Sequence, residues 1–285
     1  MSAKTGIEWT QRTWNPTTGC DKVSAGCKHC YAEKLALRLK AMGNRRYSHG
    51  FALTLHGDKV REPLSWREPQ VVFVNSMSDL LHRDVPLDFI AACVDAMVEA
   101  DWHTYQILTK RPERWAEVTA TVIGRHDRWP RHVLPGTSIE NRRALDRLPH
   151  LALAGEADTV RMISVEPLLE SLLYREAHPD RDDAVLALAG QLAAARIGWV
   201  ITGGEAGWDA RPAEVEWFRE VRDACTVAEI PFFHKQHGGV GTTKLAKRGG
   251  TLALLDGQMH HEMPAVQTGQ PPAARGSRSA QLALV

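Results

Sequence analysis

Short β-rich runs alternate with longer amphipathic stretches along most of this 285-residue chain. Such alternation is typical of βα units around a parallel sheet, because a crossover helix returns the chain to the edge where the next strand starts. The clearest predicted strands are residues 71–75, 104–109, 133–138, 160–166, 197–203 and 231–235, with weaker candidates at 8–14 and 51–55. Eight strands with intervening helices predict an α/β fold, first a (β/α)8 TIM-like barrel, with a six-stranded partial barrel carrying extra elements as the alternative.

Between the strands, amphipathic patterns predict the helices. They cover residues 31–42, 86–100, 112–123, 142–154, 183–195 and 213–229. An α/β barrel commonly takes about 250 residues as one domain, so residues 1–262 are predicted to form a single domain. Residues 263–285 are rich in Pro, Gly, Ala, Ser and Gln, a composition typical of a disordered tail.

Composition and charge indicate a globular chain with a substantial core, with 44% hydrophobic and 24% charged residues. The sequence has no run of about 18 apolar residues and no secretory signal in its first residues, so we expect a cytoplasmic protein without a membrane partner. The net charge of +1 gives no overall signature of nucleic-acid binding. However, residues 1–70 carry +6 and the remainder −5, and a basic region of this kind attracts anionic ligands.

The strongest local signal is the segment 19–31, here called the cysteine segment. It contains three of the five cysteines in a C-x6-C-x2-C spacing: Cys20, Cys27 and Cys30. In a reducing compartment such crowding favours a metal over disulfides. Zinc needs a fourth ligand, such as His29 or the remote Cys93 or Cys225, whereas an iron–sulfur cluster held by three thiolates keeps one iron open for a small molecule. Cys93 and Cys225 lie in helical patterns typical of small buried hydrophobes.

The run CKHCYAE, after a predicted strand and before a helix, resembles the cluster loop of the radical S-adenosylmethionine superfamily, whose usual spacing is C-x3-C-x2-C. The motifs GIEWT, VFVNSMSDL, ILTKRPER, SIENR, ISVEPLL, VITGGE and FFHKQ are more closely similar to a three-cysteine-motif family found in phages and bacteria. The resemblance implies the partial barrel of radical S-adenosylmethionine enzymes and a [4Fe–4S] cluster on the three cysteines. It further implies that the open iron binds S-adenosylmethionine, and that an electron donor drives its cleavage to a 5′-deoxyadenosyl radical.

The later predicted strands end in polar residues, and in a barrel these ends converge on one mouth. A polar group costs roughly 2–7 kcal/mol when it is buried without a partner, so such ends in series indicate a lined pocket. The run GGE at 203–205 resembles the motif that holds the methionyl amine in radical enzymes, although it follows the seventh predicted strand and not the second. The residues predicted to bind the cofactor are Gly203, Gly204, Glu205, Lys110, Ser138, Glu140, Asn141 and Glu166. Those predicted to bind the substrate are Asn75, Ser76, Asp79, Arg111, Lys235 and Gln236.

These patterns give two hypotheses for function. The first is a radical S-adenosylmethionine enzyme, for which the basic N-terminal region and the cationic strand ends favour a nucleotide or nucleic-acid substrate. The alternative is a zinc-binding, non-radical protein whose barrel mouth binds nucleic acid or a protein partner. The sequence identifies no catalytic residue for the hydrogen transfer itself.

Overall fold

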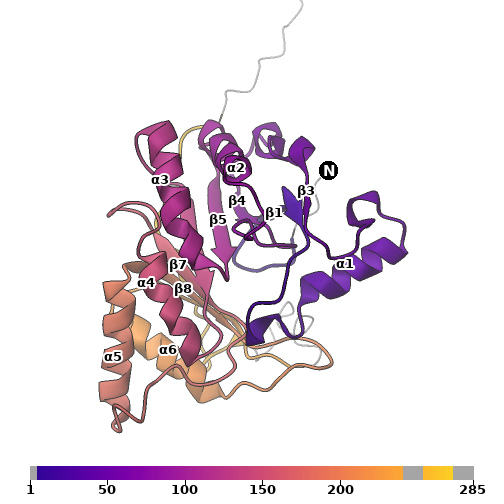
Figure 1. Ribbon diagram of the computed structural model, residues 1–285. Coiled ribbons are helices and arrows are strands. Elements are labelled where there is room, and N and C mark those ends of the chain that lie inside the picture. Colours follow the sequence, from indigo (N-terminus) through magenta and orange to yellow (C-terminus); the bar gives the residue numbers. More distant parts are fainter. Residues whose placement is uncertain (1–4, 240–252, 272–285) are drawn as a thin grey trace, which may run out of the picture.

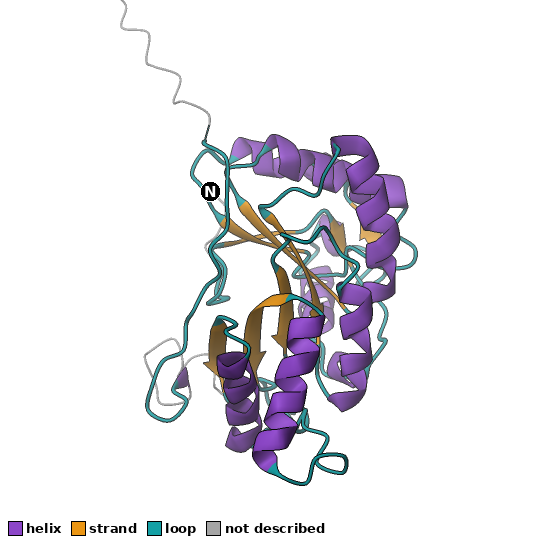
Figure 2. Ribbon diagram, turned by 90° about the vertical axis from the view of Figure 1, so that its left-hand side faces the viewer, coloured by secondary structure: helices purple, strands orange, loops and turns teal. Residues whose placement is uncertain are grey.

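The computed structural model describes residues 5–239 and 253–271, and its centre is a seven-stranded parallel sheet (Figure 1). In pairing order the strands are β1 (Arg12–Trp14), β4 (Val71–Val74), β5 (Thr104–Thr109), β6 (Val133–Ser138), β7 (Arg161–Val165), β8 (Ile197–Gly203) and β9 (Phe232–Gln236). The sheet curls (Figure 2), but β1 and β9 do not pair with each other in the described part of the chain. The closed eight-stranded barrel is therefore wrong. The partial barrel is confirmed, with seven strands in place of six.

The predicted strand at 51–55 lies outside this sheet. Only β3 (Thr54–Leu55) is extended there, and it pairs antiparallel with β2 (Thr17–Thr18) in a separate two-stranded sheet. Two residues are too few to span a barrel wall, so no strand bridges β1 and β9 among the described residues. This segment instead supports the cysteine segment, because the backbone N–H of Cys20 donates to the carbonyl of Phe51 over 3.1 Å.

Helices cover the convex face of the half-barrel (Figure 2). They are α2 (Leu87–Glu99), α3 (Trp115–His126), α4 (Leu148–Leu151), α5 (Arg181–Ala194) and α6 (Val215–Val227), while α1 (Tyr31–Ala41) stands apart from them in Figure 1. The predicted helix at 142–154 is mostly a 3-10 helix, Arg142–Arg147, followed by the short α4. Pro149 explains the change, because proline is accepted in the first turn of an α-helix but clashes with the preceding turn in its interior.

The strands pack apolar side chains on both faces of the sheet, because successive side chains point to opposite sides. Val74 and Ile107 of the sheet belong to the main core, on the side of the helices. The same core contains the buried Cys93 of α2 and Cys225 of α6. The concave face carries a second core, here called the apolar floor. It comprises Trp9, Leu134, Met162, Trp199, Ile201 and Phe233, with Phe73 and Leu108 packed against them. Only residues 12–14 of the predicted strand 8–14 are extended, and Trp9 contributes to the floor instead.

The C-terminal part of the chain is described only as far as residue 271. Residues 263–271 contain no helix or strand, yet Val266 packs against the apolar floor and Gly269 donates a backbone hydrogen bond to the carbonyl of Asp101 over 2.9 Å. The rest of the predicted tail, residues 272–285, lies outside the described residues. Among the helices that the structure describes, none is both long and apolar enough to cross a bilayer.

Candidate functional site

All pairings in the main sheet are parallel, so the C-terminal ends of its strands meet at one edge, here called the mouth. At this edge the concave face becomes polar. Lys110, Glu166 and Lys235 lie two or four positions beyond floor residues of β5, β7 and β9, so the alternation of the strands points their side chains toward the concave side. Gly203 takes the same place on β8, where it adds no side chain. A polar layer therefore lies above the apolar floor.

An ion pair between β7 and β9 forms the centre of this layer. The Lys235 ammonium lies 3.4 Å from Oε1 and 3.5 Å from Oε2 of Glu166, and both side chains are partly exposed. Glu166 Oε1 is buried and makes no hydrogen bond. A Cβ atom at Gly203 would lie 2.5 Å from this oxygen, so glycine is needed to make room for the carboxylate. The two opposite charges match the ammonium and carboxylate groups of an α-amino acid.

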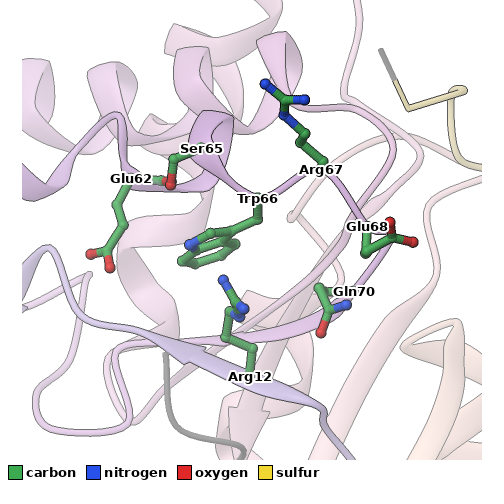
Figure 3. Close-up of a pocket in the computed structure, with 7 residues that line it drawn as sticks. All are labelled: Arg12, Glu62, Ser65, Trp66, Arg67, Glu68 and Gln70. Atoms are coloured by element: carbon green, nitrogen blue, oxygen red, sulfur yellow. The ribbon is translucent and has the colours of Figure 1, made fainter. Parts of the chain in front are cut away.

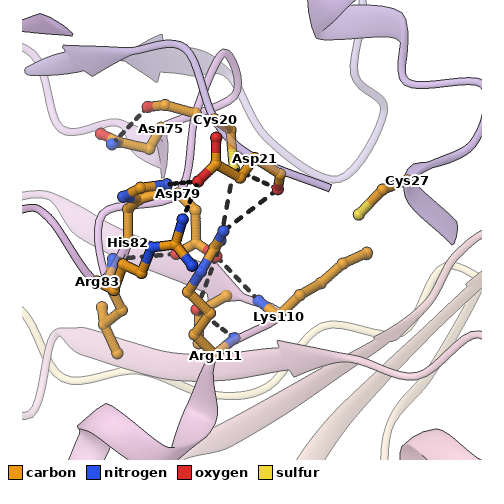
Figure 4. A network of polar contacts seen from close by, with 12 residues as sticks. Cys20, Asp21, Cys27, Asn75, Asp79, His82, Arg83, Lys110 and Arg111 are labelled. Carbon is orange, nitrogen blue, oxygen red and sulfur yellow. Dashed lines mark hydrogen bonds and ion pairs between the residues drawn. The ribbon is translucent and has the colours of Figure 1, made fainter. Parts of the chain in front are cut away.

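The first cysteine is anchored at the end of β5 by Arg111 (Figure 4). The buried guanidinium donates to Cys20 Sγ over 3.5 Å, to Asp79 Oδ2 over 3.0 Å and to the carbonyl of Asp21 over 3.2 Å. Asp79 also accepts hydrogen bonds from the Thr109 hydroxyl and from a backbone N–H of the same strand end. Burial and the Asp79 carboxylate raise the pKa of the Cys20 thiol to about 11, against the effect of Arg111. A bound metal would displace this proton.

The last part of the cysteine segment is held by the end of β8. His29 Nδ1 donates to Glu205 Oε2 over 3.1 Å, and Arg211 donates to both oxygens of the same carboxylate. Arg211 also donates to the carbonyl of Ala25 over 3.0 Å. Burial acts to raise the pKa of Glu205, but the hydrogen bonds from Arg211 and His29 lower it to about 2. Both carboxylate oxygens of Glu205 thus already accept hydrogen bonds within the chain. Its observed role is to hold the cysteine segment, and not to bind the predicted amine of a cofactor.

Two further strand ends complete the anchoring. At β6, Glu140 is fully buried and accepts from the backbone N–H of Gly26 over 3.4 Å and from Arg147 over 2.7 Å. Although burial raises the pKa of Glu140, Lys110 and Arg147 bring it below its usual value. At β4, the Tyr31 hydroxyl donates to the carbonyl of Ser76. The cysteine segment therefore crosses the mouth with contacts to the ends of β4, β5, β6 and β8.

The remaining predicted residues have structural partners. Asn141 caps the 3-10 helix that follows β6, and its side chain accepts from the backbone N–H of Ala144 over 3.0 Å. Ser138 is buried and offers its carbonyl to Arg147. Asn75 is buried and donates to Thr17 and Ser78, while Ser76 bonds Asn15. Gln236 donates to the carbonyl of Gly204 over 2.8 Å, and a Cβ at Gly204 would lie 2.0 Å from the carbonyl of His237. The structure gathers these residues at the mouth but engages them within the chain.

A cavity of about 440 Å³ opens beside the cysteine segment at the ends of β5 and β6. Its lining has four basic side chains, Lys110, Arg143, Arg147 and His150, and three acidic ones, Glu113, Glu140 and Asp146. The basic residues Arg143, Arg147 and His150 were not predicted, because they follow the end of β6 by several residues. Arg211 was not predicted for the same reason, since it follows the end of β8 by several residues. The available signal was the buried acid itself, since a carboxylate at a strand end requires a cation from the following loop or helix.

The three cysteines do not form a ready site for a single metal ion. In the described residues, the group of three metal-ligating side chains whose donor atoms lie within 4.8 Å of one another is Asp21, His82 and Asp84, without a cysteine. His29, a predicted candidate for a fourth zinc ligand, contacts Glu205 through Nδ1, and this hydrogen bond leaves its Nε2 available as a ligand. Cysteines that hold a cubane cluster bind different irons and stand farther apart than the ligands of one zinc ion. Three thiolates on different irons are compatible with this spacing, because a cluster does not require its cysteine sulfurs to converge on one ion.

Comparisons with known proteins give one structural likeness and one family. A double mutant of spore photoproduct lyase with bound AdoMet and dinucleoside spore photoproduct is similar in structure, with a TM-score of 0.45 and 13% sequence identity. The likeness covers 74% of this chain, which spans 60% of that protein. Among curated proteins, no relative matches the chain. A family profile described as "Protein of unknown function (DUF5131)" matches residues 4–264. The chain therefore belongs to the DUF5131 family.

Proposed function

We propose that this protein is a radical S-adenosylmethionine enzyme that holds a [4Fe–4S] cluster through Cys20, Cys27 and Cys30. The observation that carries the proposal is the position of the cysteine segment, which is bound to four strand ends at the mouth of the half-barrel. A cluster with three protein thiolates leaves one iron open, and this segment lies beside a polar concave face. When bound and reduced, the cluster would supply the electron that cleaves S-adenosylmethionine to a 5′-deoxyadenosyl radical.

The residues of the mouth then take distinct roles. Glu166 and Lys235 provide opposite charges for the amino-acid part of the cofactor. Arg111 positions Cys20 through its buried contact with Asp79, and Glu205 positions the segment through His29. The apolar floor below closes the concave face to water, which protects a reactive radical from side reactions.

Metal analysis of protein purified without oxygen tests the proposal. We expect about four irons and four sulfides per chain, in line with one [4Fe–4S] cluster. We also expect 5′-deoxyadenosine after reduction with dithionite in the presence of S-adenosylmethionine. Cys27→Ala should lose most of the iron, because the thiolate is a direct ligand.

The matched control is Cys93→Ala, because Cys93 is buried in the main core away from the cysteine segment. It should keep its iron even if the protein is less stable. One zinc per chain without iron would reject the cluster and favour the zinc-binding alternative. Full iron without any 5′-deoxyadenosine would reject the radical reaction while keeping the cluster.

A further inference from the structure

Exposed aromatic rings lie beside the mouth, on α1 and on the loop after β8. Trp208 is 88% exposed, and Tyr31 at the start of α1 is 57% exposed although its hydroxyl is bound at the end of β4. Large aromatic side chains are usually buried for most of their surface area. Two exposed rings next to a candidate site therefore indicate a surface that binds another molecule. The two parts are connected, because Lys34 of α1 lies 3.6 Å from Asp209 in the loop.

Cations accompany these rings. On α1, Tyr31, Lys34 and Arg38 are spaced by three and four residues and share one face of the helix, opposite the buried Ala32 and Ala36. Residues 22–50 contain seven lysines and arginines but one acid, Glu33. Within the described residues, the exposed side chains of Lys28, Arg38, Lys40 and Arg45 form no ion pair. We call the set Lys28, Tyr31, Lys34, Arg38 and Trp208 the α1 surface.

The combination matches one class of ligand. Phosphates of a nucleic acid pair with unneutralised lysines and arginines, and bases stack on exposed aromatic rings whatever their sequence. A duplex keeps its bases stacked inside, so an aromatic platform selects a single strand. The apolar side chains on α1 do not favour a membrane, because Leu35 and Leu37 point to different sides of the helix.

We propose that a single-stranded nucleic acid binds the α1 surface, with bases on Trp208 and Tyr31 and a phosphate on Arg38, whereas Lys34 is paired with Asp209. As an assignment of substrate class this rests on the proposed function, because Cys30 caps the N-terminus of α1 and the helix leads directly from the cysteine segment. A strand on this surface lies beside the mouth, where one of its nucleotides can enter the concave face.

Fluorescence anisotropy with a labelled, mixed-sequence DNA oligonucleotide of twelve nucleotides tests the proposal, on protein without added S-adenosylmethionine or reductant. Trp208→Ala should weaken binding about 5- to 150-fold, because stacking contributes about 1–3 kcal/mol per base. Trp208→Phe should retain most of the affinity. Arg38→Ala should reduce the slope of log K against log salt by about 0.7, the value for one phosphate contact on a single strand.

Arg67→Ala is the matched control. Arg67 is also an exposed arginine without an ion pair in the described structure, but it lies at the opposite end of the sheet, beside Arg12 and Trp66 in a separate cavity (Figure 3). It should leave the salt slope unchanged. Equal effects of Arg38→Ala and Arg67→Ala, no effect of Trp208→Ala, or equally tight binding of a duplex or of polyglutamate would overturn the proposal.

The two proposals fail separately. Normal oligonucleotide binding by a chain that carries no iron would reject the radical function and leave the α1 surface in place. A chain with four irons and 5′-deoxyadenosine formation, but no binding of the oligonucleotide, would reject only the α1 surface.

Discussion

At the scale of single residues, the buried pair of Asp79 and Arg111 decides how the first cysteine is held. Asp79 accepts four hydrogen bonds, including one from the guanidinium, and both side chains are almost fully buried. Removing one partner of a buried ion pair lowers the free energy of unfolding far more than removing both, because the remaining charge is left without a counter-charge. Arg111 also donates to Cys20, so the pair links the fold to the cysteine segment.

Arg111→Met should therefore lower the free energy of unfolding by about 3 kcal/mol, since Asp79 keeps its other hydrogen bonds but loses its counter-charge. The double variant Asp79→Asn/Arg111→Met should recover part of this loss. Urea denaturation of metal-free protein measures both values. If the single and double variants were equally unstable, the cost would come from lost packing and not from an uncompensated charge.

At the scale of elements, the close approach of β8 and the end of β9 shapes the concave face. Gly204 donates to the carbonyl of Gln236 over 2.9 Å and accepts from the side chain of the same residue. A Cβ at this position would lie 2.0 Å from the carbonyl of His237, and no real Cβ tolerates such a distance. The two strand ends can therefore meet only because the residue between Gly203 and Glu205 has no side chain.

Gly204→Ala should lower the free energy of unfolding by about 1–3 kcal/mol, the usual cost of inserting a methyl group into closely packed structure. Gly190→Ala in α5 is the matched control, because a Cβ there meets nothing within 4 Å. It should raise stability by roughly 0.8–1 kcal/mol, since alanine favours a helix over glycine. Thermal and urea unfolding compare the two variants, and a similar effect of both would show that β8 and β9 separate easily.

At the scale of the whole molecule, folding keeps several histidines neutral in the interior. His234 on β9 is fully buried, bonds the Thr202 hydroxyl over 2.9 Å and packs against Phe218 of α6. Burial, helped by neighbouring histidines, lowers the pKa of His234 from 6.5 to about 3. Between these two values the unfolded chain binds a proton at this residue and the native chain does not.

The free energy of unfolding should consequently fall as the pH is lowered from about 6.5 towards 3, by up to about 1.4 kcal/mol per pH unit from this one residue. His234→Gln should show a shallower dependence in that range, because glutamine takes up no proton. His49→Gln, on an exposed loop, should follow the parent protein. Urea denaturation between pH 4 and pH 7 measures the three curves, and identical slopes for parent and His234→Gln would contradict the burial argument.

Much of the sheet could be predicted because the strands are encoded by local sequence patterns. The runs at 104–109, 133–138 and 197–203 coincide with β5, β6 and β8, since their apolar and β-branched residues fit a pleated, buried surface. The pair 54–55 could not be assigned to the right sheet, because a local pattern does not reveal which partner an edge segment finds. Because residues 54–55 pair with β2 and not with the main sheet, no described strand joins β1 to β9.

The sequence by itself determined the parallel α/β architecture and the gathering of polar strand ends at one mouth, because strand periodicity and parallel pairing are consequences of local composition. Only the tertiary structure decided which of those polar groups remain open to a ligand. Glu205 and Glu140 became internal anchors because Arg211 and Arg147, which follow them by six and seven residues, pair with them, whereas Glu166 keeps an oxygen without a hydrogen bond. Such pairing depends on which loops return to the mouth, and three-dimensional packing alone sets that.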